Sequence, residues 1–228
     1  MNAVPPLLRL IDVTRRHGAA HDPQSFALGP LTLDVLSGTW TSIVGRSGAG
    51  KTTLLQIMGG LDAPDTGRVV IANPDVSNGA TGSPDVVRRF DIGFVYQQGV
   101  FVEHLPVWQN VAVRLIPAGV PARERRRRAA AVLEELGIGE MLDRRPASLS
   151  GGEQQRVAVA RAVVHQPRIV IADEPTSNVD ADTGSAIVNC LKGLQTRGSA
   201  IIVATHDSAV SASSDRCWHM ESGRIVDE

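Results

Sequence analysis

The sequence has 228 residues and a mass of 24.2 kDa, which is enough for one α/β domain with an inserted lobe. Hydrophobic residues make up 43% and charged residues 21%, as in ordinary globular domains, and a net charge of -1 gives no general attraction to nucleic acid. Apolar runs such as residues 169–172 and 200–204 are far shorter than the roughly 20 residues that a membrane-spanning helix needs.

Two features bear on the compartment. Residues 1–11 contain two prolines and lack a basic stretch followed by an apolar core, so they do not resemble a secretory signal. The only cysteines, Cys190 and Cys217, are far apart and lack metal-ligand spacing. One disulfide is open to such a pair, but without an export signal we expect reduced, packed thiols and a cytoplasmic protein.

Taken in chain order, the sequence predicts short strands that alternate with helices. Short apolar stretches within residues 7–36 predict a small antiparallel sheet at the front of the chain. Residues 98–149 are expected to be mostly helical, because apolar residues recur at helical spacing and Glu and Arg fill the other face. The other expected elements are strands at 41–44, 92–96, 169–172 and 200–204, helices at 51–59 and 183–194, and a surface loop at 73–84.

The strands at 169–172 and 200–204 are apolar throughout, which is typical of strands buried on both faces. Their alternation with helices favours a mostly parallel sheet covered by helices on both faces. We therefore expect an α/β fold, with an antiparallel β subdomain at the N-terminal side and an inserted helical subdomain.

A glycine-rich segment connects the strand at 41–44 to the helix that follows it. The segment fits the pattern G-x-x-x-x-G-K-[ST] in full, in the strand–loop–helix context that this phosphate-binding motif requires. Glycines let successive N–H groups point at phosphate oxygens, and the helix N-terminus adds its dipole. The alternative is an accidental glycine-rich turn. The residues expected to bind nucleotide are Gly45, Arg46, Ser47, Gly48, Ala49, Gly50, Lys51, Thr52 and Thr53.

Within this loop, we expect Lys51 to reach the β- and γ-phosphates and the Thr52 hydroxyl to ligate Mg²⁺. A second element ends the strand at 169–172, where Asp173 and Glu174 follow four apolar residues. Strand ends of this kind deliver carboxylates to the crevice where α/β sheets bind ligands. Alone, such an acid pair is as often a helix cap or a surface ion pair. Beside a phosphate loop, Asp173 is expected to hold Mg²⁺ and Glu174 to polarise the attacking water, as in P-loop NTPases.

A third element, residues 149–156, has the sequence Leu-Ser-Gly-Gly-Glu-Gln-Gln-Arg. Ser150 and Glu153 form the S-x-x-E capping-box pattern ahead of an apolar run, which predicts a well-capped helix. Ser150, Gly151 and Gly152 also offer a hydroxyl and unobstructed N–H groups at the positive end of a helix dipole. This is a second anion site, which one phosphate loop does not need, so we expect it to act on a second chain.

With these elements in order, residues 7–228 resemble the ATP-binding cassette ATPases. In that family two subunits pack head to tail, and ATP lies between the phosphate loop of one and the signature serine and glycines of the other. The resemblance implies ATP and Mg²⁺ as cofactors and a homodimer in which Ser150, Gly151 and Gly152 contact the γ-phosphate bound by the neighbour. It also implies one domain over 1–228, with a catalytic RecA-like core over 1–97 and 150–228 and a helical subdomain over 98–149.

The resemblance assigns four further residues, each with a simpler alternative. Gln97 matches the glutamine that senses Mg²⁺ and the attacking water, and otherwise is an exposed loop residue. His206 matches the histidine that contacts the γ-phosphate, and otherwise lies on the surface. Asp180 is expected near the dimer interface. His17 stands where the family usually has an aromatic residue stacked on adenine, so it departs from the pattern, and it is equally well a surface-loop histidine.

Among the family's uses, we expect an ATPase that drives separate transmembrane permease subunits at the cytoplasmic face of the membrane, with no nucleic-acid partner. Residues 59–67 and 93–97 resemble the branch that serves lipoprotein release, macrolide and peptide export, and cell division. A signalling or cell-division ATPase that passes force to a membrane partner remains an alternative. A DNA-repair ATPase is less favoured, because the sequence lacks a long heptad run or a cysteine cluster.

Overall fold

The structure is a computed structural model that describes residues 5–17, 26–72, 92–97, 99–177 and 179–227, with the side chains of His17 and Phe26 left out. Its strands are β1 (Leu8–His17), β2 (Phe26–Val35), β3 (Trp40–Val44), β4 (Thr66–Ile71), β5 (Ile92–Val95), β6 (Ile169–Asp173), β7 (Ala200–Ala204), β8 (Arg216–Glu221) and β9 (Arg224–Asp227). Its α-helices are α1 (Lys51–Met58), α3 (Val107–Ala112), α4 (Ala122–Glu135), α5 (Gly151–Val163), α6 (Ala181–Thr196) and α7 (Ser208–Ser211). Short 3₁₀ helices are η1 (Val113–Leu115), η2 (Gly139–Met141) and η3 (Pro146–Ser148).

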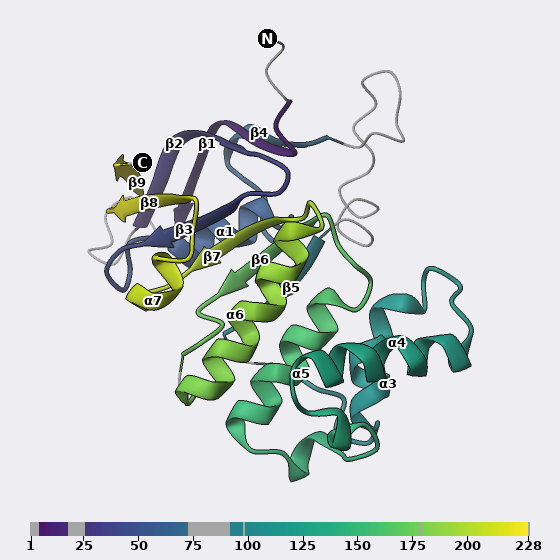
Figure 1. Ribbon diagram of the computed structural model, residues 1–228. Helices are drawn as coiled ribbons and strands as arrows, with labels where there is room; N and C mark the ends of the chain where they lie inside the picture. The colour runs from purple at the N-terminus through teal and green to yellow at the C-terminus, as the bar shows by residue number, and fades with distance from the viewer. Residues whose placement is uncertain (1–4, 18–25, 73–91, 98, 178, 228) are drawn as a thin grey trace.

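The described strands form two sheets (Figure 1). The smaller is antiparallel, with the order β2-β1-β4. The larger has the order β5-β6-β7-β3-β8-β9, and only its β8–β9 pair is antiparallel. The expected α/β fold is therefore confirmed, with its antiparallel front sheet and mostly parallel core sheet.

Alternate residues of the central strands face two separate cores. In β6, Val170 and Ala172 pack on the side of α5 and α6, whereas Ile169 and Ile171 pack on the side of α1 and the smaller sheet. All five residues of β6 and all five of β7 are buried. Because side chains alternate across a sheet, a strand covered on both faces must be apolar at every position.

Helices cover both faces of the larger sheet, as expected. Helix α1 lies against β6 and β7 between the two sheets, and α5 and α6 lie on the opposite face (Figure 1). Helices α3 and α4 pack on each other and on α5, where Ala129 and Leu133 of α4 are fully buried. In the described part of the chain, no helix combines the length and apolarity needed to span a bilayer.

Three strands were not expected from the sequence. These are β4, which completes the smaller sheet, and the β8–β9 hairpin at the edge of the larger one. In β8, buried Trp218 and Met220 alternate with exposed His219 and Glu221, a period-2 pattern typical of a half-covered strand. Cys190 and Cys217 are both free thiols, as expected. The expected surface loop at 73–84 lies outside the described residues.

One titratable group, a histidine whose two ring nitrogens are buried, makes stability depend on pH. His165 follows α5, where burial, with a smaller contribution from the charge of Arg114, lowers its pKa from 6.5 to about 4. In the unfolded chain the ring takes up a proton near pH 6.5, whereas in the folded chain it stays neutral down to about pH 4. Stability contributed by the neutral ring is therefore full above pH 6.5 and is lost as the pH falls toward 4.

We therefore expect the free energy of unfolding to fall by about 2 kcal/mol more in the wild type than in His165→Leu between pH 7 and pH 5. Leucine fills most of the same apolar volume and carries no titratable group. Chemical denaturation at pH 7, 6 and 5 measures the difference. Identical pH profiles for the two proteins would show that His165 does not carry this dependence.

Candidate active site

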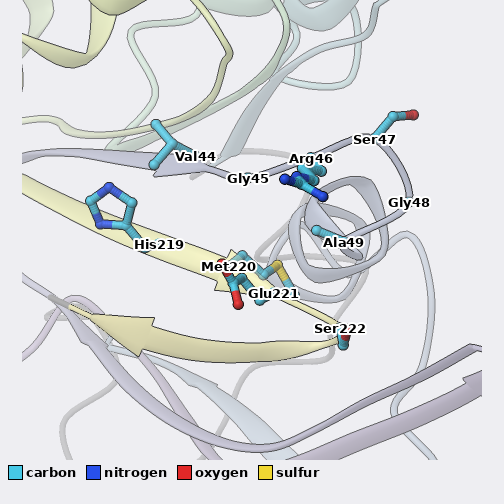
Figure 2. Close-up of a pocket in the computed structure, with 10 residues that line it drawn as sticks. All are labelled: Val44, Gly45, Arg46, Ser47, Gly48, Ala49, His219, Met220, Glu221 and Ser222. Carbon is cyan, nitrogen blue, oxygen red and sulfur yellow. The ribbon is translucent and has the colours of Figure 1, made fainter.

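The glycine-rich loop curls around the N-terminus of α1 and lines a cavity of about 570 Å³ (Figure 2). Gly48 and Gly50 have φ values of 79° and 104°, which L side chains rarely adopt. A Cβ on Gly45 would overlap the carbonyl oxygen of Met220. Ser47 lies at the outer edge of the loop with its side chain pointing away from α1 (Figure 2). The loop thus needs glycine for both its curvature and its packing.

The other wall of this cavity comes from the β8–β9 hairpin, which sequence reasoning missed. His219, Met220, Glu221 and Ser222 line it, and the N–H of Gly223 donates to the carbonyl of Ala49 over 2.9 Å. The period-2 alternation of β8 was the signal that could have revealed the strand. Its position beside the loop could not be predicted, because it depends on the parallel pairing of β8 with β3.

Lys51, the first residue of α1, folds back over the loop. Its ammonium group donates to the carbonyl of Gly45 over 2.7 Å and to that of Arg46 over 3.2 Å. These contacts hold the cation inside the curl of the loop, where the N–H groups of a phosphate loop converge.

The end of β6 brings the first carboxylate to this loop. The hydroxyl of Thr52 donates to Oδ2 of Asp173 over 2.7 Å, and Asp173 is buried. Burial raises the pKa of Asp173 above its ordinary value, although the hydroxyl of Thr52 and the charge of Lys51 act in the opposite direction. Two oxygen atoms of the kind that bind hard cations, one from a hydroxyl and one from a carboxylate, therefore lie next to each other beside the phosphate loop.

Glu174 and His206 form a second contact next to the first. Nδ1 of His206 lies 2.8 Å from Oε2 of Glu174, and the histidine side chain is 73% exposed while that of the glutamate is only 13% exposed. Glu174 has a φ of 51°, a left-handed conformation that is costly for a residue with a Cβ. Its N–H donates to the carbonyl of Ala204 over 2.9 Å, and both N–H and hydroxyl of Ser177 donate to its carbonyl.

The N-terminus of α5 has the capping box expected from the sequence. The hydroxyl of Ser150 accepts from the N–H of Glu153 over 3.3 Å, and Oε2 of Glu153 accepts from the N–H of Ser150 over 2.7 Å. Ser150 and Gly151 are exposed, and a Cβ on Gly151 would meet no atom within 4 Å. This helix terminus is thus well ordered and open on one side.

Asp180 caps α6, and its carboxylate accepts from the N–H and the hydroxyl of Thr183 over 2.8 and 2.9 Å. A Cβ on Gly152 would lie 3.8 Å from Oδ2 of Asp180, so the starts of α5 and α6 are close together. Within the described part of the chain, no hydrogen bond or ion pair joins Ser150, Gly151, Gly152 or Asp180 to the set formed by residues 45–53, Asp173, Glu174 and His206.

Two further expected residues are placed only in part. Gln97 follows β5 and is exposed, which fits either of its two interpretations. His17 is the last residue of β1 and pairs in register with Phe26, but its side chain lies outside the description, so contact with adenine stays a prediction.

A second concavity, which we call the groove, has a volume of about 700 Å³ and lies beside β5, between the residues that follow α1, the η1 region and the C-terminal end of α5. Tyr96 is 41% and Val100 81% exposed, so apolar surface faces solvent here. The residues that line the groove are Gly59, Leu61, Ile92, Phe94, Tyr96, Val100, Val113, Arg114, Pro117, Arg161 and Ala162.

Named proteins of similar sequence match nearly all of the chain. The macrolide export ATP-binding/permease protein MacB of Hyphomonas neptunium is 38% identical over 224 residues, which are 98% of this chain and 35% of that protein. The pyoverdine export ATP-binding/permease protein PvdT of Pseudomonas aeruginosa is 38% identical over 98% of this chain and 34% of that protein. The chain thus spans about a third of the length of these relatives.

Solved structures agree with the sequence relatives. The dimeric structure of a post-hydrolysis state of the ATP-binding cassette MJ0796, bound to ADP and Pi, is 34% identical with a TM-score of 0.87, and the match covers 96% of this chain and 97% of that one. The family model described as ABC transporter matches residues 28–177. The resemblance noted in the sequence is confirmed: this chain belongs to the ABC transporter family, as one of its ATP-binding cassettes.

Proposed function

We propose that this chain hydrolyses ATP between two copies of itself and passes the resulting motion to a membrane permease that exports its cargo. The observation that carries the proposal is the pair of adjacent contacts beside the phosphate loop, Thr52 with Asp173 and Glu174 with His206. We further propose one domain over residues 1–228, with the core in 1–97 and 150–228 and the helical part in 98–149.

In this proposal the loop residues 45–53 bind the phosphates of ATP. The N–H groups of the loop and the dipole of α1 favour an anion, and Lys51 supplies a fixed cation. On binding, the ammonium of Lys51 exchanges its bonds to the Gly45 and Arg46 carbonyls for bonds to the β- and γ-phosphate oxygens.

The oxygen atoms of Thr52 and Asp173 beside the loop are suitable ligands for Mg²⁺. Among the described residues, no group of three or more His, Cys, Asp or Glu side chains could hold a metal. Mg²⁺ in nucleotide sites is instead held by one or two protein oxygens together with substrate phosphates and water. Thr52 and Asp173, whose side-chain oxygens are 2.7 Å apart, fit this pattern. Gln97 is the third proposed ligand. Bound Mg²⁺ neutralises the charge that develops on the phosphates.

Glu174 is the proposed general base. Its carboxylate accepts a hydrogen bond from the attacking water and takes up the proton as the water oxygen bonds to the γ-phosphorus and the bond to the ADP oxygen breaks. His206 fixes that carboxylate through Nδ1, and a protonated ring can offer Nε2–H to a γ-phosphate oxygen. The left-handed backbone at Glu174 limits the positions that its side chain can take.

The second half of each ATP site is proposed to come from a second chain. Ser150, Gly151 and Gly152 form an open, dipole-positive helix end, and none of the hydrogen bonds described for them reaches this chain's own phosphate loop. Asp180, close to Gly152, then lies near the same interface. The similarity to MJ0796, whose solved structure is dimeric, supports this arrangement.

The permease is proposed to dock at the groove. The groove combines exposed apolar side chains, including Tyr96 and Val100, with a position next to Gln97, so a docked segment would lie beside the catalytic site. Two relatives, named as macrolide and pyoverdine export ATP-binding/permease proteins, support an export role at a membrane. The cytoplasmic face is the proposed location. Macrolide-like, peptide or lipoprotein cargo is the proposed range.

We expect Glu174→Gln to lower kcat for ATP hydrolysis roughly 10² or more while changing ATP affinity less than about threefold. The amide keeps the size of the side chain but cannot accept a proton, and the phosphate loop is untouched. Phosphate release and nucleotide titration measure the two quantities. Glu140→Gln, the same chemical change at an exposed residue of η2, is the control and should behave as wild type. Near-normal hydrolysis by Glu174→Gln would remove the proposed base.

We expect Gly151→Asp to abolish turnover without lowering the melting temperature. An added side chain meets open space in the single chain, and an acid in the first turn of a helix is favourable, but in the dimer its charge would face a γ-phosphate. Lys51→Ala should also be inactive, because its loop has lost its cation.

Mixing the two inactive variants in equal amounts should restore up to about a quarter of wild-type activity, because half of the dimers are mixed and each has one intact shared site. Normal hydrolysis by Gly151→Asp alone would contradict a site completed by a second chain.

A further inference from the structure

A buried glutamine of α5 contacts the turn that contains the proposed base. Gln155 is only 8% exposed, and its Nε2 donates to the carbonyl of Pro175 over 3.0 Å. Pro175 directly follows Glu174 and has no N–H of its own, so its carbonyl is its only backbone hydrogen-bonding group. Burial of an amide group without a hydrogen-bond partner lowers the stability of a protein, so the bond to Pro175 favours this one position of the Gln155 side chain.

The turn at residues 174–177 has an uncommon backbone conformation that needs support. Glu174 is in the left-handed region, which costs on the order of 1 kcal/mol or more for a residue with a Cβ. Two supports come from within the catalytic core, namely the bond of the Glu174 N–H to Ala204 and those of Ser177 to the Glu174 carbonyl. Gln155 adds a third support, from a helix outside the β6–α6 connection.

The same helix begins with the signature residues. Gln155 lies four residues after Gly151, one helical turn further on, so both are on one side of α5. At the start of α5, a Cβ on Gly152 would lie 3.5 Å from the hydroxyl of Thr183 and 3.8 Å from the carboxylate of Asp180. The first turns of α5 therefore contact both ends of the connection between β6 and α6: Gln155 contacts Pro175 just after β6, and Gly152 lies against the start of α6.

We propose that Gln155 is a positioning residue for Glu174, and that it ties the Ser150–Gly152 end of α5 to the catalytic turn of the same chain. This inference rests on the proposed function, because it presupposes that Glu174 is the base and that Ser150–Gly152 meets the neighbour's nucleotide. A displacement of the start of α5 by that nucleotide would then reach Glu174 through one hydrogen bond.

The test replaces Gln155 by methionine, which keeps the length of the side chain but has no N–H donor. We expect kcat to fall between about 10-fold and 100-fold, the size of effect that a small misplacement of a catalytic group produces. KM and Kd for ATP should stay within about twofold of wild type, because no described hydrogen bond of Gln155 involves the phosphate loop. Gln155→Asn, which withdraws the donor by one CH₂ group, should lose kcat in the same way.

Two matched variants separate positioning from general damage to the helix. Gln154→Met makes the same substitution at the adjacent residue, whose amide donates to Pro146 and Leu149 rather than to the catalytic turn, and should keep wild-type kcat. Gln155→His, whose Nε2–H reaches about as far as the amide of glutamine, should recover kcat to within about threefold of wild type. Melting temperatures of all four variants verify that each is folded.

The outcomes distinguish this inference from the proposed function. Wild-type protein without ATP hydrolysis would refute the proposed function itself. If the wild type hydrolyses ATP and Glu174→Gln does not, the proposed function stands, and unchanged kcat in folded Gln155→Met or Gln155→Asn would overturn only the role of Gln155. An equal loss in Gln154→Met, or a loss confined to KM, would overturn that role as well.

Discussion

The structure depends on the burial of a carboxylate at the end of a strand that is apolar on both faces. Asp173 ends β6, an interior strand of the larger sheet, and its desolvation raises its pKa despite the hydroxyl of Thr52 and the charge of Lys51. A charge in such a place is stable only where cations and hydrogen-bond donors surround it. Asp173 is therefore stable as a buried carboxylate because the hydroxyl of Thr52 and the charge of Lys51 lie beside it.

Backbone conformations that are rare elsewhere gather around this carboxylate. Gly48 and Gly50 curve the phosphate loop, and Glu174 has a left-handed backbone although it has a Cβ. Buried strands hold both loops at their bases, since β3 and β6 each pair with β7. Strained positions persist only where surrounding contacts determine them, and here those contacts include two sheet pairings and the amide of Gln155. The rigid strands thus allow the loops to keep functional shapes.

Local sequence was sufficient for those parts of the site that depend on neighbouring residues. The phosphate loop, the capping box of Ser150 and Glu153, and the buried strands β6 and β7 all follow from short-range patterns of glycine, capping residues and apolar runs. The proximity of Thr52 and Asp173 followed from two motifs whose positions in a sheet are linked. The loop, the capping box and the two strands needed no knowledge of which distant segments meet.

The parts that sequence reasoning missed depend on contacts between distant segments. The wall of the phosphate-loop cavity comes from β8, which pairs with β3 although about 170 residues separate them. The contact of His206 with Glu174 requires β6 and β7 to be neighbours, and that of Gln155 with Pro175 requires α5 to lie beside the turn that follows β6. The side chain of His17 is not among those that the structure describes, so its contact with adenine stays a prediction.

The central claim is that one chain has only half of a working ATP site. The rate of phosphate release per chain, measured from nanomolar to high micromolar protein at saturating ATP and Mg²⁺, tests this claim most directly. A shared site predicts that the rate per chain rises in proportion to protein concentration at low concentration, so that the total rate is second order, and that it levels off as dimers form. A rate per chain that is the same at every concentration, in a protein that stays monomeric by light scattering, would contradict the claim.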